Sequence, residues 1–242
     1  MSAWVKKRFW TDTSVVPAEG GFTVHLDGRG LRTPLKAPVT VPTEAAAALI
    51  AAEWEAQTGK IDPETMPATR AANAAIDKVT GQQAEVTEMI AAYGDSDLIC
   101  YRAAAPQELV ARESAAWDPL VDWAAVTFGA RLTVQAGVMH VPQPPEALRA
   151  LSAPLHQMSA FELTAFHDLV SMSGSLVIGL ASIMELAPTD TLWALSRIDE
   201  DWQTELWGSD DEAENLARLR KSSFVNANRF YDAVRTGTRT LR

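Results

Sequence analysis

The feature that most constrains the fold is a change of pattern near residue 82. Before it, short alternating apolar segments are separated by turn residues; after it, strand signals nearly vanish and apolar residues recur at helical spacing. The helices predicted in this second part span residues 83–101, 107–128, 145–156, 160–187, 189–207 and 211–235, and only residues 131–141 read as extended. The pattern predicts an α+β protein with two domains, residues 1–82 and 83–242.

The first part contains the signals of a small antiparallel sheet. Phe22, Val24 and Leu26 alternate with polar residues, which is typical of a half-buried strand. The dipeptide Asp27-Gly28 is a hairpin-turn signal, and residues 39–41 form another short apolar run. His25 falls on the polar side of its strand, so we interpret it as a surface residue.

Two helices are predicted after this sheet. Thr43 is a suitable N-cap and begins an alanine-rich helix that extends to about Thr58. Trp54 shares the apolar face of that helix and is interpreted as a core anchor against the sheet. The second helix covers residues 69–79 and is stopped at Gly81.

Composition excludes several classes of function. The chain of 242 residues has 31 acidic and 21 basic residues and a net charge of -10, which argues against a nucleic-acid-binding domain. Cys100 is the single cysteine, so no intramolecular disulfide can form and a reducing compartment is expected. With four histidines as well, a multi-ligand zinc or iron–sulfur site is not expected. Basic or amphipathic protein surfaces are the expected partners.

Two segments need to be tested as targeting or membrane elements. Residues 1–10 contain Lys6, Lys7 and Arg8 but no apolar run follows, so they do not resemble a secretory signal peptide. Residues 169–187 approach the roughly 20 residues that a bilayer requires. Serine and glycine interrupt this run, and we interpret it as a buried helix of a bundle.

Few residues have the pattern of a reaction centre. Asp95 and Asp97 flank Ser96, and paired carboxylates can bind a metal or perform acid–base catalysis. The interpretation that we favour is that one aspartate caps a helix and the other pairs with Arg102. Histidines on the predicted helices have no second ligand three or four residues away, and the glycine pairs lack a phosphate-loop pattern. No catalytic, cofactor-binding or metal-binding residue is therefore assigned.

The most unusual stretch is acidic and contains tryptophan. Between Asp199 and Glu214 there are eight carboxylates and no lysine or arginine. At 3.6 residues per turn, one apolar stripe predicts a buried helix face made of Leu192, Leu195, Ile198, Trp202 and Leu206. Glu200, Gln203 and Trp207 fall on a second stripe, roughly 120° round the helix, which suits a partner surface. The alternative is a solvated acidic helix whose Trp207 folds back onto its own domain.

Several segments together resemble one known family. They are Glu53-Trp54 with Gln57, the loop from Pro63 to Met66-Pro67 with Thr69, Asp97-Leu98-Ile99-Cys100-Tyr101-Arg102, Trp117-Asp118-Pro119-Leu120 with Trp123, and Gln203 with Trp207-Gly208. In this order they resemble the chaperones that protect the α subunit during assembly of the F1 sector of ATP synthase. Ser96 departs from the threonine expected before the aspartate but preserves the hydroxyl.

The resemblance implies a small α+β domain followed by an orthogonal helical bundle, without enzymatic activity or a cofactor. It also implies binding of free F1 α subunit until the β subunit replaces it. The residues to which it assigns this binding are Glu200, Gln203, Glu205 and Trp207. It leaves open whether a second set is scaffold, which we favour, or contact: Trp54, Asp97, Tyr101, Arg102, Trp117 and Asp118.

The resemblance also gives expectations about the state and location of the chain. No mitochondrial presequence is evident, so a bacterial cytoplasmic member is expected, whereas eukaryotic relatives would be in the mitochondrial matrix. No membrane insertion is expected, and a monomer suffices for a client-binding placeholder.

Two other classes of function stay open at this point. A hydrolase would use Asp95 with Asp97, or Glu200 with Glu205, as acid and base. Glu200 and Glu205 are five residues apart, about 140° round a helix, which weakens that reading. A carrier for an apolar ligand would need an internal cavity in the helical bundle.

Overall fold

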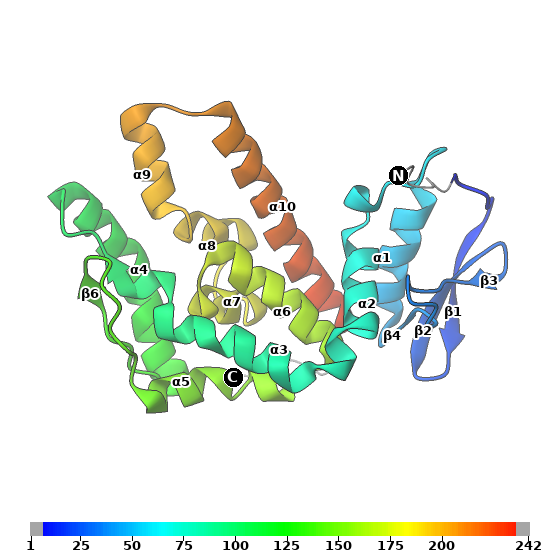
Figure 1. Cartoon of the computed structure of the whole chain (residues 1–242), viewed down its shortest axis with the longest axis horizontal. Helices are drawn as coiled ribbons and strands as arrows, with labels where there is room; N and C mark the ends of the chain where they lie inside the picture. The colour runs from blue at the N-terminus through cyan, green and yellow to red at the C-terminus, as the bar shows by residue number, and fades with distance from the viewer. Residues whose placement is uncertain (1–6, 236–242) are drawn as a thin grey trace. The chain divides into compact units, whose positions relative to one another are not determined.

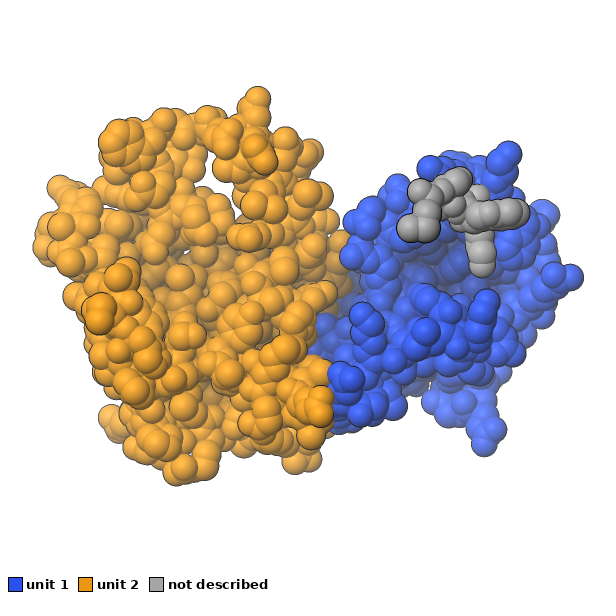
Figure 2. Space-filling model, viewed as in Figure 1, with its two compact units in different colours: residues 1–83, 159–165, 229–242 blue, residues 84–158, 166–228 orange. Residues whose placement is uncertain are grey.

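The computed structural model describes residues 7–235, which divide into two compact units (Figure 2). Within the described chain, unit 1 comprises residues 7–83, 159–165 and 229–235, and unit 2 comprises residues 84–158 and 166–228. Helices α6 (Ala160–Ser173) and α10 (Asp211–Val234) each contribute to both units. The division into domains 1–82 and 83–242 stays a prediction. The absence of a signal peptide also stays a prediction, because residues 1–6 lie outside the described residues.

Unit 1 contains the predicted antiparallel sheet. Its strands are β1 (Thr13–Ala18), β2 (Gly21–Leu26), β3 (Arg29–Gly30) and β4 (Thr40–Val41). Strand β2 pairs antiparallel with each of the other three, so it is the organising strand. Val24 and Leu26 are buried while His25 is half-exposed, which confirms the alternation read from the sequence.

The hairpin turn at Asp27-Gly28 follows from backbone conformation. Both residues have positive φ, 48° and 77°, as a two-residue type I′ turn requires. Gly21 is needed at the start of β2 because a Cβ there would lie 2.1 Å from the carbonyl oxygen of Val41. These two positions fix how the strands enter and leave the sheet.

Helices α1 (Glu44–Glu55) and α2 (Pro67–Asp77) complete the N-terminal part of unit 1. The Thr43 hydroxyl accepts a hydrogen bond from the Ala46 amide at 3.1 Å, so the predicted N-cap is confirmed. Helix α1 packs on β1 and β2 (Figure 1). Trp54 is half-buried and meets Trp10 edge-on at a centroid distance of 5.1 Å. A short 3-10 helix, η2 (Val79–Gly81), ends this segment.

The remaining helices are α3 (Gln83–Ala91), α4 (Gln107–Phe128), α5 (Pro145–Ser152), α7 (Leu176–Ile183), α8 (Thr189–Leu195) and α9 (Ile198–Trp207). Short elements join them, namely the 3-10 helices η1 (Pro63–Thr65), η3 (Ala92–Ser96), η4 (Leu98–Cys100) and η5 (Leu155–Gln157), and the strands β5 (Tyr101–Arg102) and β6 (Gln135–Ala136), which pair in parallel. The α+β class predicted from the sequence is confirmed (Figure 1).

Four helices predicted after residue 82 are shorter or divided. The helix predicted at 145–156 ends at Ser152 and is followed by η5. The helix predicted at 83–101 ends at Ala91 and continues as 3-10 turns. The helix predicted at 160–187 is broken at Gly174, whose φ of 72° is left-handed, and Ser175 then caps α7. The helix predicted at 189–207 is two helices, α8 and α9. Pro119 does not interrupt α4, which runs for 22 residues.

Helix α7 lies at the centre of unit 2, because each of its eight residues is buried. A Cβ at Gly179 would lie 2.7 Å from Val170 and 3.2 Å from Phe166, so glycine permits this close packing of α7 on α6. The small residues of the apolar run at 169–187 therefore serve packing, as we predicted. Among the described residues, no helix combines the length and hydropathy needed to cross a membrane.

Candidate functional site

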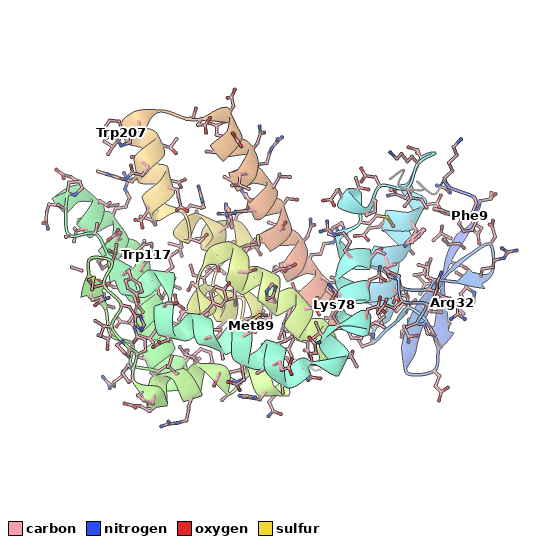
Figure 3. All side chains as sticks on the ribbon, in the orientation of Figure 1. Phe9, Arg32, Lys78, Met89, Trp117 and Trp207 are labelled. Atoms are coloured by element: carbon pink, nitrogen blue, oxygen red, sulfur yellow. The ribbon has the colours of Figure 1, made fainter. Side chains whose placement is uncertain are left out.

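Helix α9 presents the predicted partner-binding residues to solvent. Glu200, Gln203 and Trp207 are all exposed, and the Trp207 side chain is 82% accessible. Figure 3 shows Trp207 at the far end of α9, beside the loop that leads to α10. The alternative in which Trp207 folds back onto its own domain is therefore wrong.

The apolar stripe predicted as the buried face is buried at one end. Leu192 is fully buried, Trp202 is half-buried, and Leu206 is 56% exposed. The reason is the turn at Ser196-Arg197, which separates α8 from α9 so that the stripe does not run along one continuous helix. None of the residues of α9 is buried, so this helix depends on specific polar contacts to stay in place.

Arg112 of α4 provides two of those contacts. Its guanidinium donates to both carboxylate oxygens of Glu205, at 2.7 and 2.9 Å, and lies 4.9 Å from the ring centroid of Trp202. The hydrogen bond and the charge of Arg112 lower the pKa of Glu205 below its ordinary value. Glu205 is thus engaged within the chain, on the side of α9 opposite Glu200 and Trp207.

A pair of carboxyl groups forms a third contact between α4 and α9. Glu113 is only 1% exposed and accepts a hydrogen bond from the Ala103 amide at 2.7 Å. Burial, and then the hydrogen bond and charge of the neighbouring Asp199, raise the pKa of Glu113 to about 7. Near neutral pH the pair therefore holds a proton, which allows two acidic side chains to lie together.

The sequence analysis counted Asp199 among the solvated carboxylates and did not identify Glu113. The burial of Glu113 could have been predicted from helical spacing, because Glu113 lies four residues from both Leu109 and Trp117 on the buried face of α4.

Because the folded protein holds this proton, its stability is expected to depend on pH. Folding raises the pKa of Glu113 from 4.5 to about 7. The contribution of Glu113 to the free energy of unfolding is therefore fully present below pH 4.5 and is lost as the pH rises through 7. Between pH 5 and pH 8, the free energy of unfolding of Glu113→Gln should fall by about 1 to 3 kcal/mol less than that of the wild type. Urea unfolding at the two pH values measures it. Glu108→Gln, an exposed position on the same helix, should leave the wild-type pH dependence intact; equal slopes in wild type and Glu113→Gln would contradict the assignment.

Two of the family-like segments meet where α9 begins. The Trp117 indole is fully buried and its Nε1 donates to the carbonyl of Leu195, the last residue of α8, at 2.7 Å. Arg102 lies 5.0 Å from the Trp117 ring and donates to Asp118 at 2.8 Å. The prediction that Arg102 pairs with Asp95 or Asp97 is therefore wrong. Tyr101 is half-buried, and its hydroxyl lies 3.1 Å from His140 Nδ1.

Asp95 and Asp97 have separate structural roles. Asp97 is fully buried and accepts hydrogen bonds from the amides of Ile99, at 3.2 Å, and Val177, at 3.0 Å. This confirms that one aspartate of the pair caps a helix. Asp95 accepts from the Gln143 amide at 2.8 Å and lies 3.3 Å from His140 Nε2. The two carboxylates therefore serve different partners and do not form an acid–base pair.

Other candidate reactive groups are similarly occupied. Glu200 pairs with Arg197 at 2.8 Å, while Glu205 pairs with Arg112, so these two carboxylates do not converge on one bond. Burial raises the pKa of the Cys100 thiol to about 12, which disfavours a reactive thiolate. Within residues 7–235 no group of three or more histidine, cysteine, aspartate or glutamate side chains is placed to hold a metal ion.

Comparison with known proteins agrees with the family resemblance of the sequence motifs. The profile of the family described as ATP12 chaperone protein matches residues 7–125. Protein atp12, mitochondrial, of Schizosaccharomyces pombe is 26% identical over 226 residues, which cover 87% of this chain and 76% of that protein.

Solved structures give a stronger match. Atp12 from Paracoccus denitrificans is 47% identical, with a TM-score of 0.91 and coverage of 95% of this chain and 98% of that one. The Atu1473 protein of Agrobacterium tumefaciens is 39% identical, with a TM-score of 0.92 and coverage of 96% and 87%. These likenesses extend over both units of the structure. The chain belongs to the ATP12 chaperone family, the F1 assembly chaperones that its sequence motifs resemble.

Proposed function

We propose that this chain binds the unassembled α subunit of F1-ATP synthase and prevents its aggregation until the β subunit replaces it. The observation that carries the proposal is the outer face of α9, where an exposed tryptophan lies beside Glu200 and Gln203 on a helix anchored to α4. The chain then acts as a binding protein, with no reaction or cofactor of its own. A monomer suffices for this role, and the bacterial relatives favour the cytoplasm as its location.

The surface chemistry fits such a client. An unassembled subunit exposes an apolar interface that promotes aggregation. Trp207 covers part of that interface, and Glu200 and Gln203 match basic and polar groups beside it, which gives specificity and a fast encounter. Glu205 contributes indirectly, because its bond to Arg112 fixes the direction of α9. Release needs only a larger final interface with the β subunit.

Two substitutions test the surface. Trp207→Ala should weaken binding of purified α subunit by about 30-fold, the effect of losing an interface residue worth about 2 kcal/mol. Glu200→Lys should lower the soluble yield of co-expressed α subunit because it reverses one charge of the matching surface. Affinity is measured by titration and yield by fractionation of cell lysates.

Matched controls separate the surface from general effects. Phe9→Ala removes another exposed aromatic side chain, and Glu146→Lys reverses another exposed carboxylate in a first helical turn. Both should behave as wild type. If Trp207→Ala and Glu200→Lys also bind and protect the α subunit normally while remaining folded, the outer face of α9 is not the docking surface.

A further inference from the structure

The segment from Ile198 to Ser223 is a helical arm without a core of its own. It comprises α9 and the first half of α10, and none of its residues is buried. It nevertheless exposes large apolar side chains, Leu206 by 56%, Leu216 by 50% and Leu219 by 64%. Helices of a folded domain normally bury one apolar stripe. The arm therefore lacks a partner element along much of its length.

A hollow lies between this arm and α8. Trp193, Ala194 and Asp190 of α8 line its base, Asp201 lines the side formed by α9, and Ala217, Arg218 and Lys221 line the side formed by α10. Arg197, in the turn between α8 and α9, completes the lining. Figure 1 shows α9 and α10 standing apart on either side of α8, and Figure 2 shows the same part of unit 2 in space-filling form.

The size and lining of the hollow favour a protein side chain over a small molecule. Its volume is about 270 Å³, below the roughly 300 to 1,000 Å³ of typical ligand pockets. Its base is an indole, which suits an apolar side chain. Its walls are two helices, which offer no strand edge for backbone pairing, so an extended peptide has nothing to pair with. A helix laid between two helices matches the usual geometry of helix packing.

The charges of the two walls differ in sign. Lys221 is paired with Asp190 at 2.8 Å, and Arg197 with Glu200 at 2.8 Å. Among the described residues Asp201 and Arg218 form no ion pair, although Arg218 donates to the Asn215 side chain at 2.6 Å. An occupant that complements the walls therefore has a basic group toward α9 and an acidic group toward α10.

We propose that one amphipathic helix of the client lies across the hollow and inserts an apolar side chain onto Trp193, with a basic residue facing Asp201 and an acidic residue facing Arg218. This inference rests on the proposed function, since it takes the α subunit as the client. It adds a second element of the docking site, distinct from the outer face of α9. The exposed leucines of the arm, Leu206, Leu216 and Leu219, do not line the hollow and play no part in this contact.

Thiol labelling tests whether the hollow is filled. Ala217→Cys places a thiol in the hollow, whereas Ser222→Cys places one on an exposed position about 140° further round α10. The native Cys100 is buried and contributes little background. Saturating purified α subunit should slow iodoacetamide labelling of Ala217→Cys at least 10-fold and leave Ser222→Cys unchanged. Equal labelling of Ala217→Cys with and without α subunit overturns the proposal. Protection that depends only on the concentration of the chaperone also overturns it, because a second copy of the chain would then fill the hollow.

Filling the hollow provides the second measurement. Ala217→Trp should weaken binding of the α subunit at least 10-fold, Arg218→Glu should also weaken it, and Ser222→Trp should have no effect. If Ala217→Trp binds normally while Trp207→Ala does not, the hollow is not used and the outer face of α9 still is. If Ala217→Trp, Arg218→Glu and Trp207→Ala all bind normally, neither the hollow nor the outer face of α9 is the docking site. If the wild-type chain does not bind the α subunit, the proposed function itself fails. Circular dichroism confirms that each variant is folded.

Discussion

Replacing Trp117 with alanine is expected to lower the free energy of unfolding by about 3 to 5 kcal/mol. The indole is fully buried in α4, so its removal leaves a cavity in a close-packed region. It also removes the hydrogen bond from Nε1 to the Leu195 carbonyl at 2.7 Å and leaves Arg102 without the ring on which it lies. Urea unfolding followed by circular dichroism measures the change.

Trp207→Ala is the matched control, because it removes the same side chain from an 82% exposed position. It should change the free energy of unfolding by no more than about 0.5 kcal/mol. Trp117→Phe separates packing from hydrogen bonding: it should cost less than Trp117→Ala, with about 1 kcal/mol assigned to the lost donor. Equal stabilities of Trp117→Ala and Trp207→Ala would contradict the assignment of Trp117 to the core.

Local features of the fold could be predicted from the sequence because short-range rules determine them. The hairpin at Asp27-Gly28 requires two residues that accept positive φ, and the sequence supplies them. Thr43 caps α1 through its own side chain. The exposed face of α9 follows from the helical period, which separates Glu200, Gln203 and Trp207 from the apolar positions.

Contacts between distant segments could not be predicted in the same way. Arg112 and Glu205 are 93 residues apart, and the acidic stretch offers eight carboxylates from which to choose. Arg102 has an aspartate nearby in sequence, yet it pairs with Asp118 because α4 brings Trp117 and Asp118 to β5. Apolar periodicity also continued through the break at Gly174-Ser175, so two packed helices looked like one.

These long-range contacts explain why the scaffold matters for the proposed docking surface. Arg112, Glu113 and Trp117 lie within six residues of one another on α4, and they hold Glu205, Asp199 and the end of α8, respectively. Helix α9 buries no residue, so these contacts determine where Trp207 and Glu200 are presented. Substitution of a buried residue in α4 is therefore expected to weaken client binding without touching the client.

The second large effect is expected at Asp97. Asp97→Ala should lower the free energy of unfolding at pH 7 by about 2 to 5 kcal/mol, because it leaves the buried amides of Ile99 and Val177 without their acceptor. Asp95→Ala is the control two residues earlier: its half-exposed carboxylate contacts His140 and one backbone amide, so the loss should be about 1 kcal/mol. Equal losses in the two variants would contradict the larger stabilisation that we assign to Asp97 at the junction of η4 and α7.

Titration of Asp97 is also expected to make the free energy of unfolding depend on pH. Burial is the main cause that raises the pKa of Asp97, from 3.8 to about 6, although the hydroxyl of Ser175 and nearby backbone amides oppose it. The folded protein therefore binds a proton that the unfolded chain releases between those values, and the free energy of unfolding falls as the pH rises from 3.8 through 6. Asp97→Asn cannot titrate, so its unfolding free energy should fall less than that of the wild type over this range. If the slopes of the wild type and Asp97→Asn are equal, the pKa of Asp97 is not raised in the folded protein and the prediction is wrong.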